Sequence, residues 1–339
     1  MYNISLITGD GIGPEISESA VSILETIHDK LDVKTEIISL EAGDAALKKF
    51  SKALPDETFQ SIKSSDACLK APVGESAADV IVVLRRNLDL YANIRPAKSY
   101  PNTPSLRDDI DLVIVRENTE DLYTGQEFTV DDSAVALRVI TEKASKRIAK
   151  HAFKTAIQRN QKKRVTCVHK SNVMRKTDGL FAKSCESIAN EFPDIQFDQM
   201  YVDACSMNLI RQPEEFDVIV TTNLFGDILS DESSQVVGGL GMAPAANLGD
   251  DFGLFEPVHG AAFDIAGKQI ANPTSFILSI KMMLEWLGNK NNDQNSVSAA
   301  QTLEKIVLQV IESGITTKDV GGNMSTREFT KEITNRLVC

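Results

Sequence analysis

A strand-to-helix unit over residues 216–231 constrains the fold of this chain more than any other stretch. It begins with an apolar, β-branched run from Phe216 to Val220, which is typical of a buried strand, and then changes to a helical pattern. Strand and helix patterns alternate in the same way along most of the 339 residues. This alternation predicts an α/β fold rather than an all-helical one.

Two carboxylates, Asp227 and Asp231, follow this strand on the predicted helix. Because they are four residues apart, they share one helix face, with Cβ atoms roughly 5–6 Å apart. Three apolar residues are expected to pack the opposite side against a core: Ile228, Leu229 and Val236. Paired carboxylates suit a hard cation such as Mg²⁺ or Mn²⁺. Taken alone, such a pair is more often a solvated helix face, so a metal site needs support from the rest of the chain.

The composition excludes several classes of partner. With 42% apolar and 25% charged residues, we expect a soluble, globular protein long enough for two domains. A net charge of −12 without a basic block argues against nucleic acid and anionic membranes, and no apolar run approaches the ~20 residues of a membrane span. The chain starts in a strand pattern and its cysteines lack paired spacing, so we expect a cytoplasmic protein with reduced thiols.

Candidate ligand-binding residues stand where predicted strands and helices end, the usual position of ligands in open α/β sheets. Three arginines, Arg85, Arg95 and Arg116, suggest a substrate with more than one carboxylate, because guanidinium groups match carboxylates bidentately. We expect Arg95 to lie in a short turn between Ile94 and Pro96. For any single arginine, a surface ion pair is the alternative.

Two side chains are candidates for proton transfer. Lys170 follows an apolar strand, where burial or a neighbouring cation would lower its pKa toward that of a general base. Tyr123 follows another strand, and a half-buried core tyrosine is the alternative for it.

Two loops remain open to interpretation. Residues 9–14 have the spacing G-x-G-x-G-P rather than the dinucleotide fingerprint G-x-G-x-x-G, so a tight turn is at least as plausible as a phosphate-binding loop. Residues 237–253 are rich in Gly, Ala, Pro and Asn, and we expect a crossing between domains or a long active-site loop there.

Five motifs together resemble the isocitrate/3-isopropylmalate dehydrogenase family of β-decarboxylating dehydrogenases. They are LITGDGIGPE from residue 6, LRRNLDLYANIRP from 84, RENTE from 116, NLFGDILSD from 223 and EPVHG from 256. They follow the family's order between residue 4 and about 330. The segment from Ala71 to Asp79 looks closest to the archaeal-type 3-isopropylmalate dehydrogenases of this family.

The resemblance implies the family's fold, two α/β domains with a central cleft, which is not a Rossmann fold. A large discontinuous domain of residues 1–98 and 239–339 would carry dinucleotide-binding loops. Residues 99–238 would form a smaller domain with dimerisation, metal and catalytic residues. Shared active sites imply a homodimer, with a tetramer as the alternative assembly, because a site assembled from two chains leaves a monomer inactive.

Roles for the polar residues also follow from the resemblance. The three arginines would hold the carboxylates of a small 2-hydroxy dicarboxylate. Asp227 and Asp231 would bind Mg²⁺ or Mn²⁺, with Asp203 supplied by the second subunit. Lys170, also from that subunit, would take the hydroxyl proton, and Tyr123 would help protonate the enol after CO₂ leaves.

The cofactor implied by the resemblance is NAD. Its adenosine would lie against residues 256–264, with Asn272 nearby and Asn172 toward the nicotinamide. The residues concerned are Asn172, Glu256, His259, Gly260, Ala261, Ala262, Asp264, Ile265 and Asn272. Because the Asp264 carboxylate would accept hydrogen bonds from a ribose diol and repel a 2′-phosphate, NAD is expected over NADP.

Ile81 and Val82 bear on the substrate. They lie four and three residues before Arg85, hence beside it on a helix. An apolar pair suits an isopropyl group, whereas the third carboxylate of isocitrate would be desolvated there without a partner. The resemblance therefore implies oxidative decarboxylation of 3-isopropylmalate to 4-methyl-2-oxopentanoate in leucine biosynthesis. Isocitrate or homoisocitrate is the alternative substrate. A non-catalytic regulatory subunit is a further alternative, against which the presence of every catalytic side chain argues.

Overall fold

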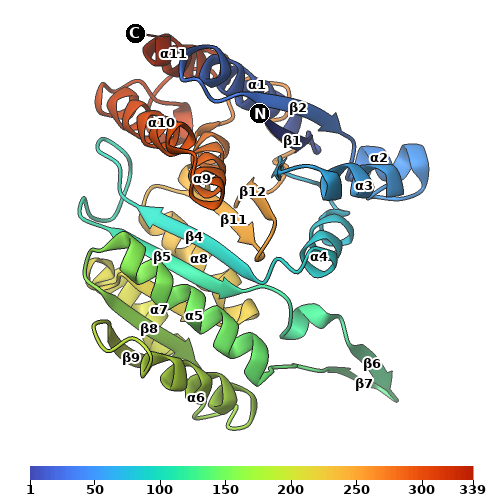
Figure 1. The fold of residues 1–339 in the computed structure, drawn as a ribbon. Helices are drawn as coiled ribbons and strands as arrows, with labels where there is room; N and C mark the ends of the chain where they lie inside the picture. The colour runs from blue at the N-terminus through green and yellow to red at the C-terminus, as the bar shows by residue number, and fades with distance from the viewer. Residues whose placement is uncertain (339) are drawn as a thin grey trace.

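The computed structural model describes residues 1–338 as a large mixed sheet with helices packed on it and a separate two-stranded hairpin (Figure 1). The sheet strands are β1 (Tyr2–Ile7), β2 (Thr35–Leu40), β3 (Ala67–Lys70), β4 (Ala92–Lys98), β5 (Asp111–Glu117), β8 (Arg164–His169), β9 (Gln196–Tyr201), β10 (Val218–Thr221), β11 (Pro244–Leu248) and β12 (Gly253–Pro257). Their spatial order is β2-β1-β3-β12-β11-β4-β5-β10-β8-β9. The α/β class predicted from the alternating patterns is confirmed.

The helices pack on the two halves of this sheet in two groups. They are α1 (Gly13–Lys30), α2 (Asp44–Phe50), α3 (Asp56–Ser64), α4 (Ala77–Asn87), α5 (Glu142–Arg159), α6 (Thr177–Ala189), α7 (Val202–Arg211), α8 (Asn223–Val236), α9 (Thr274–Asn291), α10 (Gln294–Glu312) and α11 (Thr326–Val338). Helices α1, α9, α10 and α11 contact one another at the half that contains β1 and β12, whereas α5 and α6 cover β8 and its neighbours (Figure 1). The sequence patterns did not predict α2, α3, α6 or α7. Three of these helices, α2, α3 and α7, have only 7 to 10 residues, about two to three turns, which is too few for a pattern to emerge. Helix α6 has 13 residues but contains Gly179, which disfavours a helix.

The predicted strand-to-helix unit over residues 216–231 is present as β10 and α8. Strand β10 pairs in parallel with β5 and β8, and all its residues are buried, as expected of an apolar run covered on both faces. Leu229 and Val236 pack α8 against the core as predicted. The prediction for Ile228 was wrong, because its side chain is 57% exposed. Ile228 lies three positions before Asp231 and shares the solvent side of α8 with it.

The predicted turn at Arg95 was also wrong. Strand β4 pairs antiparallel with β5 along its whole length, and Arg95 lies in its middle. Pro96 is tolerated there because the pairing of β4 with β11 ends at Ile94, so no partner on that side requires its missing N–H.

Residues 237–253 do not form a long loop. Strand β11 occupies residues 244–248 and lies in the middle of the sheet, antiparallel to β12 on one side and to β4 on the other. Its alanine and asparagine residues have low β-propensity, which pairing on both sides outweighs. The long-loop prediction was wrong because this strand is specified by its neighbours rather than by its own composition, and the alternative, a crossing between domains, stays a prediction.

The two-stranded hairpin consists of β6 (Glu127–Val130) and β7 (Ser133–Ala136) and extends beyond the main sheet (Figure 1).

The predicted domain boundary at residue 98 falls between β4 and β5, which are neighbours in one continuous sheet, so the division into two domains stays a prediction. Within residues 1–338, no helix has the length and apolar character needed to cross a membrane.

Candidate active site

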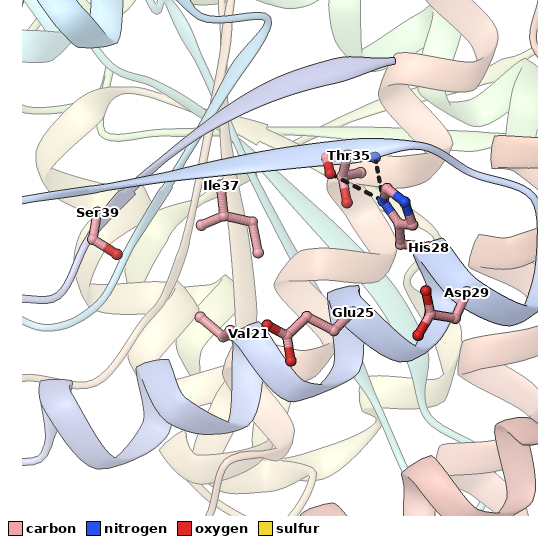
Figure 2. Close-up of a pocket in the computed structure, with 7 residues that line it drawn as sticks. All are labelled: Val21, Glu25, His28, Asp29, Thr35, Ile37 and Ser39. Carbon is pink, nitrogen blue, oxygen red and sulfur yellow. Dashed lines mark hydrogen bonds between the residues drawn. The ribbon is translucent and has the colours of Figure 1, made fainter.

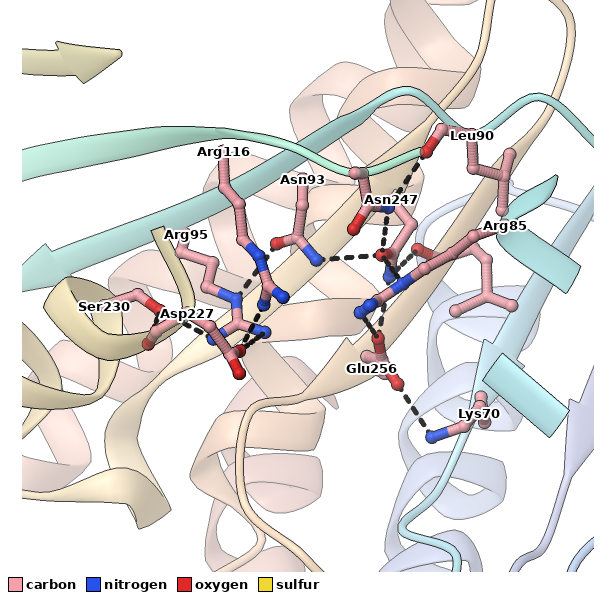
Figure 3. A network of polar contacts seen from close by, with 12 residues as sticks. Lys70, Arg85, Leu90, Asn93, Arg95, Arg116, Asp227, Ser230, Asn247 and Glu256 are labelled. Atoms are coloured by element: carbon pink, nitrogen blue, oxygen red, sulfur yellow. Dashed lines mark hydrogen bonds and ion pairs between the residues drawn. The ribbon is translucent and has the colours of Figure 1, made fainter. Parts of the chain in front are cut away.

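The three predicted arginines belong to one connected polar network in the middle of the sheet (Figure 3). Arg95 and Arg116 lie on the neighbouring strands β4 and β5, and Arg85 lies near the end of α4. All three side chains are buried. Burial, with the positive charge of Arg116 next, lowers the pKa of Arg95 to about 10. Three buried cations this close together favour the binding of an anion with several negative charges.

Arg116 is fixed by the first turn of α8. Its Nε and Nη2 donate to Asn223 Oδ1 at 3.0 and 2.7 Å, and its Nη1 forms an ion pair with Asp227. Its guanidinium carbon lies 5.1 Å from the centre of the Tyr123 ring. Residue 226 must be glycine for this arrangement, since a Cβ on Gly226 would lie 2.5 Å from the Cγ of Arg116. The close approach of α8 to β5 is thus what sets the guanidinium in place.

Arg95 connects the same helix to the network. Its Nη1 donates to Ser230 Oγ at 2.6 Å and its Nε donates to Asn93 Oδ1 at 3.0 Å. It also forms ion pairs of 3.4 Å with both Asp227 and Asp231. The two predicted metal-binding carboxylates therefore lie next to two of the predicted substrate-binding arginines.

Arg85 lies in a separate part of the network with Glu256. Its Nε donates to Asn247 Oδ1 at 2.9 Å, and its Nη2 lies 3.3 Å from Glu256 Oε1. The other oxygen of Glu256 accepts from Lys70 at 2.7 Å. Although burial opposes ionisation, Lys70 and Arg85 hold the pKa of Glu256 at about 2. Glu256, predicted as a cofactor contact, is thus buried on the arginine side, on β12 (Figure 3).

The two aspartates of α8 differ in their electrostatics. Burial acts against ionisation of Asp227, but Arg116 and then Arg95 outweigh it, so the pKa of Asp227 is lowered. Burial raises the pKa of Asp231, which has fewer cationic neighbours. The phenol of Tyr123, in the short 3₁₀ helix η1 (Leu122–Thr124), donates to Asp227 Oδ2 at 2.6 Å. Burial raises the pKa of Tyr123, so its hydroxyl carries a proton at neutral pH.

Lys170 and Asp203 form an ion pair of their own. Lys170 follows β8, and Asp203 lies in the first turn of α7 with 61% of its side chain exposed. The hydrogen bond from Lys170 lowers the pKa of Asp203. Across residues 1–338, no three His, Cys, Asp or Glu side chains are grouped so that they could hold a metal ion. Asp203 therefore does not complete the Asp227–Asp231 pair within a single chain.

The predicted cofactor residues are mostly on the loop between β12 and α9. Gly260 and Asp264 are exposed, His259, Ala262 and Ile265 are half-buried, and Ala261 is buried. This loop packs against the glycine-rich loop after β1, where the Ile12 N–H donates to the Ala261 carbonyl at 2.8 Å. A Cβ on Gly11 would lie only 2.0 Å from that carbonyl oxygen, so this glycine allows the close approach.

Two asparagines predicted to contact the cofactor have different surroundings. Asn272 is buried, accepts the Thr274 N–H at 2.9 Å and donates to Asp319 at 3.0 Å, so its amide is already engaged at the start of α9. Asn172 is exposed in the turn after β8.

Ile81 and Val82 lie on α4, one turn before Arg85. Both side chains are half-buried, and Arg85 itself is buried. The predicted apolar pair and the arginine therefore share one side of the same helix.

A hollow of about 560 Å³ between α1 and β2 is separate from this network (Figure 2). It is lined by Val21, Glu25, His28, Asp29, Thr35, Ile37 and Ser39. The Thr35 N–H donates to His28 Nδ1 at 3.1 Å, so the histidine is engaged in joining α1 to β2. None of the predicted site residues lines this hollow.

The sequence did not identify several asparagines of the network. Asn247 on β11 is central, since its Oδ1 accepts from Arg85, Asn93 and Asn118 at 2.8 to 3.0 Å. Asn93 was detectable, because it lies two positions before Arg95 and so shares its face of a strand. Asn247 was not, because its segment was taken for a loop.

The sequence and the fold of this chain match those of known proteins. Residues 3–335 match the family model for isocitrate/isopropylmalate dehydrogenase. The chain is 52% identical to a 3-isopropylmalate dehydrogenase of Sulfurisphaera tokodaii, with 99% of each chain covered. It is 44% identical to a homoisocitrate dehydrogenase of Methanocaldococcus jannaschii, covering 99% and 98%. The solved isocitrate dehydrogenase of Methylococcus capsulatus matches all of both chains with 43% identity and a TM-score of 0.94.

Proposed function

The chain belongs to the isocitrate/isopropylmalate dehydrogenase family, and on that premise we propose that it oxidises and decarboxylates 3-isopropylmalate with NAD. The product is 4-methyl-2-oxopentanoate with CO₂, and the place of the reaction is leucine biosynthesis. Sequence identity of 52% to a 3-isopropylmalate dehydrogenase, against 44% to a homoisocitrate dehydrogenase, supports this choice of substrate; each comparison covers 99% of the chain.

The observation that carries the choice is the apolar pair Ile81 and Val82 beside Arg85. Both side chains are half-buried on α4, so a group bound next to Arg85 would meet methyl groups there. An isopropyl substituent would be removed from water at that place. The additional carboxylate of isocitrate would lose its hydration without gaining a cation from these two residues.

The arginines bind and orient the substrate. Arg95 and Arg116 are fixed by β4, β5 and α8, and their guanidinium groups are held by Asn93, Asn223 and Ser230 before any ligand arrives. Such pre-organisation reduces the entropy lost when a dicarboxylate is bound.

The family implies a divalent metal ion, and the carboxylates of α8 fit one. Asp227 and Asp231 lie on one helix face with 38% and 58% of their side chains exposed, and hard cations prefer carboxylate oxygens. We assign the third carboxylate to Asp203 of the partner subunit. A cation held there would supply Lewis-acid chemistry, a lower pKa of the substrate hydroxyl and stabilisation of negative charge on its oxygen, and bound NAD would be the acceptor of the hydride from C2.

Two side chains move protons. Lys170 of the partner subunit accepts the proton of the C2 hydroxyl as the ketone forms. After the carboxylate on C3 leaves as CO₂, Tyr123 donates its phenolic proton to C3 of the resulting enolate, which becomes the keto acid, and the phenolate then takes a proton from solvent. The raised pKa of Tyr123 and its hydrogen bond to Asp227 keep this proton in place until it is needed.

The partner subunit is proposed to be a second copy of this chain. Exposed apolar side chains gather on α7 and α8, namely Met207 (64%), Ile210 (57%) and Ile228 (57%), and the two helices pack against each other. Apolar patches of this kind mark interfaces. Around a two-fold axis, α7 of one copy would meet α8 of the other, which brings Asp203 toward the partner's Asp231 in both sites.

NAD rather than NADP follows from Asp264. Its side chain is exposed on the loop after β12, where a carboxylate would accept hydrogen bonds from a ribose diol and repel a 2′-phosphate. Asn172, His259, Ile265 and Asn272 stay proposed contacts of the same cofactor.

One assay of the purified chain tests the proposal. Formation of NADH with Mg²⁺ is compared for 3-isopropylmalate, isocitrate and homoisocitrate, and each is repeated with NADP. The expected result is a higher kcat/KM for 3-isopropylmalate with NAD than for any other combination. Faster oxidation of isocitrate would contradict the substrate, and equal turnover with NADP would contradict the role of Asp264. The double change Asp79→Ser with Ile81→Asn replaces a carboxylate and an apolar side chain of α4, the helix that carries Arg85, by two hydrogen-bond donors, and should therefore shift preference toward isocitrate.

A further inference from the structure

A buried ion cluster that makes none of the proposed substrate contacts joins three segments of the chain. Arg138, which follows the β6–β7 hairpin, lies between Asp121 and Asp178, whose side chains are both fully buried. Its Nε and Nη2 donate to the two oxygens of Asp121 at 2.6 and 3.2 Å, and its Nη1 lies 2.7 Å from Asp178 Oδ1. Its Nη2 also donates to the Thr222 hydroxyl at 2.8 Å, directly before α8.

Asp178 connects this cluster to Lys170. The second oxygen of Asp178 accepts the backbone N–H of Lys170 at 2.6 Å. The Lys170 carbonyl accepts from the N–H groups of Val173 and Met174 at 3.0 and 2.9 Å. Both the backbone N–H and the backbone carbonyl of the proposed base, Lys170, are therefore engaged in hydrogen bonds. Arg138 fixes the Asp178 carboxylate, which accepts from that N–H.

Asp121 connects the cluster to the residues around Tyr123. Its Oδ1 accepts the Leu122 N–H at 2.9 Å, and Leu122 begins the short helix η1 that carries Tyr123. Its Oδ2 accepts the Leu224 N–H at 3.1 Å, in the first turn of α8, which carries Asp227. A carboxylate at this place satisfies a free N–H and complements the helix dipole.

We infer that Arg138 is a positioning residue for both proton-transfer groups, acting on Lys170 through Asp178 and on Tyr123 through Asp121. This inference rests on the proposed function, which gives Lys170 and Tyr123 their roles. Lys170 serves the partner's site and Tyr123 serves the chain's own site. The cluster therefore also forms a rigid connection between the two active sites of the dimer.

The chain offers a matched control for this cluster. Arg159 bridges Asp111 and Asp217, with its Nη2 2.9 Å from Asp111 Oδ1 and its Nε 2.8 Å from Asp217 Oδ1. This second cluster has the same chemistry and an arginine of similar burial, with 15% of the Arg159 side chain exposed against 11% for Arg138, although the Asp111 side chain is 30% exposed. It lies at the amino ends of β5 and β10, whereas Arg116 and Asp227 are at their carboxyl ends. A purely structural role would make the two arginines equivalent.

The experiment compares Arg138→Met and Arg159→Met in the full-length protein. Steady-state kcat and KM are measured with 3-isopropylmalate, NAD and Mg²⁺, and amide hydrogen exchange is measured without ligands. Both variants are expected to lower the melting temperature. Only Arg138→Met is expected to lower kcat, by about 10- to 100-fold, as for other residues that orient catalytic groups. Exchange should become faster in both segments 120–124 and 169–175 of the Arg138→Met variant, and Arg159→Met should leave exchange in these two segments unchanged.

Arg138→Lys keeps the positive charge if the methionine variant does not fold. A single ammonium cannot reproduce the planar fork that reaches two carboxylates and a hydroxyl, so kcat should stay low in a folded protein. Equal loss of kcat in the Arg138 and Arg159 variants, or faster exchange in only one of the two segments, would overturn the inference. Because hydrogen exchange needs no substrate, it tests the cluster even if the wild-type chain proves inactive on 3-isopropylmalate, an outcome that would overturn the proposed function instead.

Discussion

The proposed active site combines two regions that differ in their exposure to solvent within a single chain. The region around Arg85, Arg95 and Arg116 is buried, and its side chains are held by strands in the middle of the sheet. In the region of Lys170 and Asp203, 24% and 61% of the two side chains are exposed, and their charges form an ion pair. Buried arginines that lie close together suggest an anion-binding site from the structure of one chain alone. The exposed Lys170–Asp203 pair acquires a proposed role only when a second copy of the chain is placed beside it.

The first prediction separates the two regions genetically. Lys170→Ala and Asp227→Asn should each lower kcat by about 10²- to 10⁴-fold, since one removes the proposed base and the other a metal ligand. If the regions come from different chains, mixed dimers of the two variants contain one intact site. Refolding or co-expressing them should recover roughly one quarter of wild-type activity for random pairing.

The control is each variant mixed with itself, which should recover nothing. Mixtures without recovered activity, despite hybrid dimers detected by native mass spectrometry, would show that both regions act within one chain. That result would remove the distinction between the regions.

The second prediction concerns the buried region alone. Arg116→Met should lower kcat/KM for 3-isopropylmalate by about 10²- to 10³-fold, because truncating one partner of a buried charge pair costs 2–5 kcal/mol. Arg86, the exposed neighbour of Arg85 on α4, provides the control Arg86→Met. The measurement is kcat/KM for 3-isopropylmalate, determined by steady-state kinetics for both variants and the wild type. Similar losses in both would mean that burial does not distinguish the functional arginines.

How far the sequence could predict these regions depends on where the information lies. The β10–α8 unit was predictable because its apolar run and helical period are local. The position of β11 was not, since two neighbouring strands specify it. The prediction that Ile228 packs against the core was wrong because an apolar residue on a helix can face either its own chain or a second copy. Periodicity alone does not distinguish these two cases.

In the site, too, the identity of several residues was predictable from local sequence, whereas their contacts depend on segments far apart in the chain. The three arginines and two aspartates could be proposed from residue type and motif, but their mutual contacts come from the neighbouring positions of β4, β5 and α8. Asn247, which accepts three hydrogen bonds, carries no signal in the sequence because asparagine is common in loops. The Lys170–Asp203 pair joins residues 33 positions apart, and no periodic pattern reports such a contact.

The third prediction tests whether the exposed region is an interface. Met207→Asp places a charge among the exposed apolar side chains of α7 and α8, so the dimer should dissociate at higher protein concentration than the wild type. Specific activity should fall on dilution and recover on concentration. Ile157→Asp, at an exposed apolar position on α5, is the control. Association is measured by analytical ultracentrifugation. If the Met207→Asp variant associates as tightly as the wild type, the proposed interface is contradicted.

The last and smallest effect is one of pH on stability. The pKa of Glu256 lies at about 2, below its ordinary value of 4.5. A lowered carboxylate pKa contributes stability that is present above the ordinary value and is lost as the pH falls from about 4.5 toward 2. The free energy of unfolding should therefore fall more steeply in wild type than in Glu256→Gln between pH 5 and 3, as followed by urea titrations. Asp203 also has a lowered pKa, but its pair with Lys170 is solvent-screened, so Asp203→Asn should leave the slope unchanged. Equal slopes for wild type and Glu256→Gln would mean that the buried region is not held by its own ion pairs, and the contrast between the two regions would then rest on exposure alone.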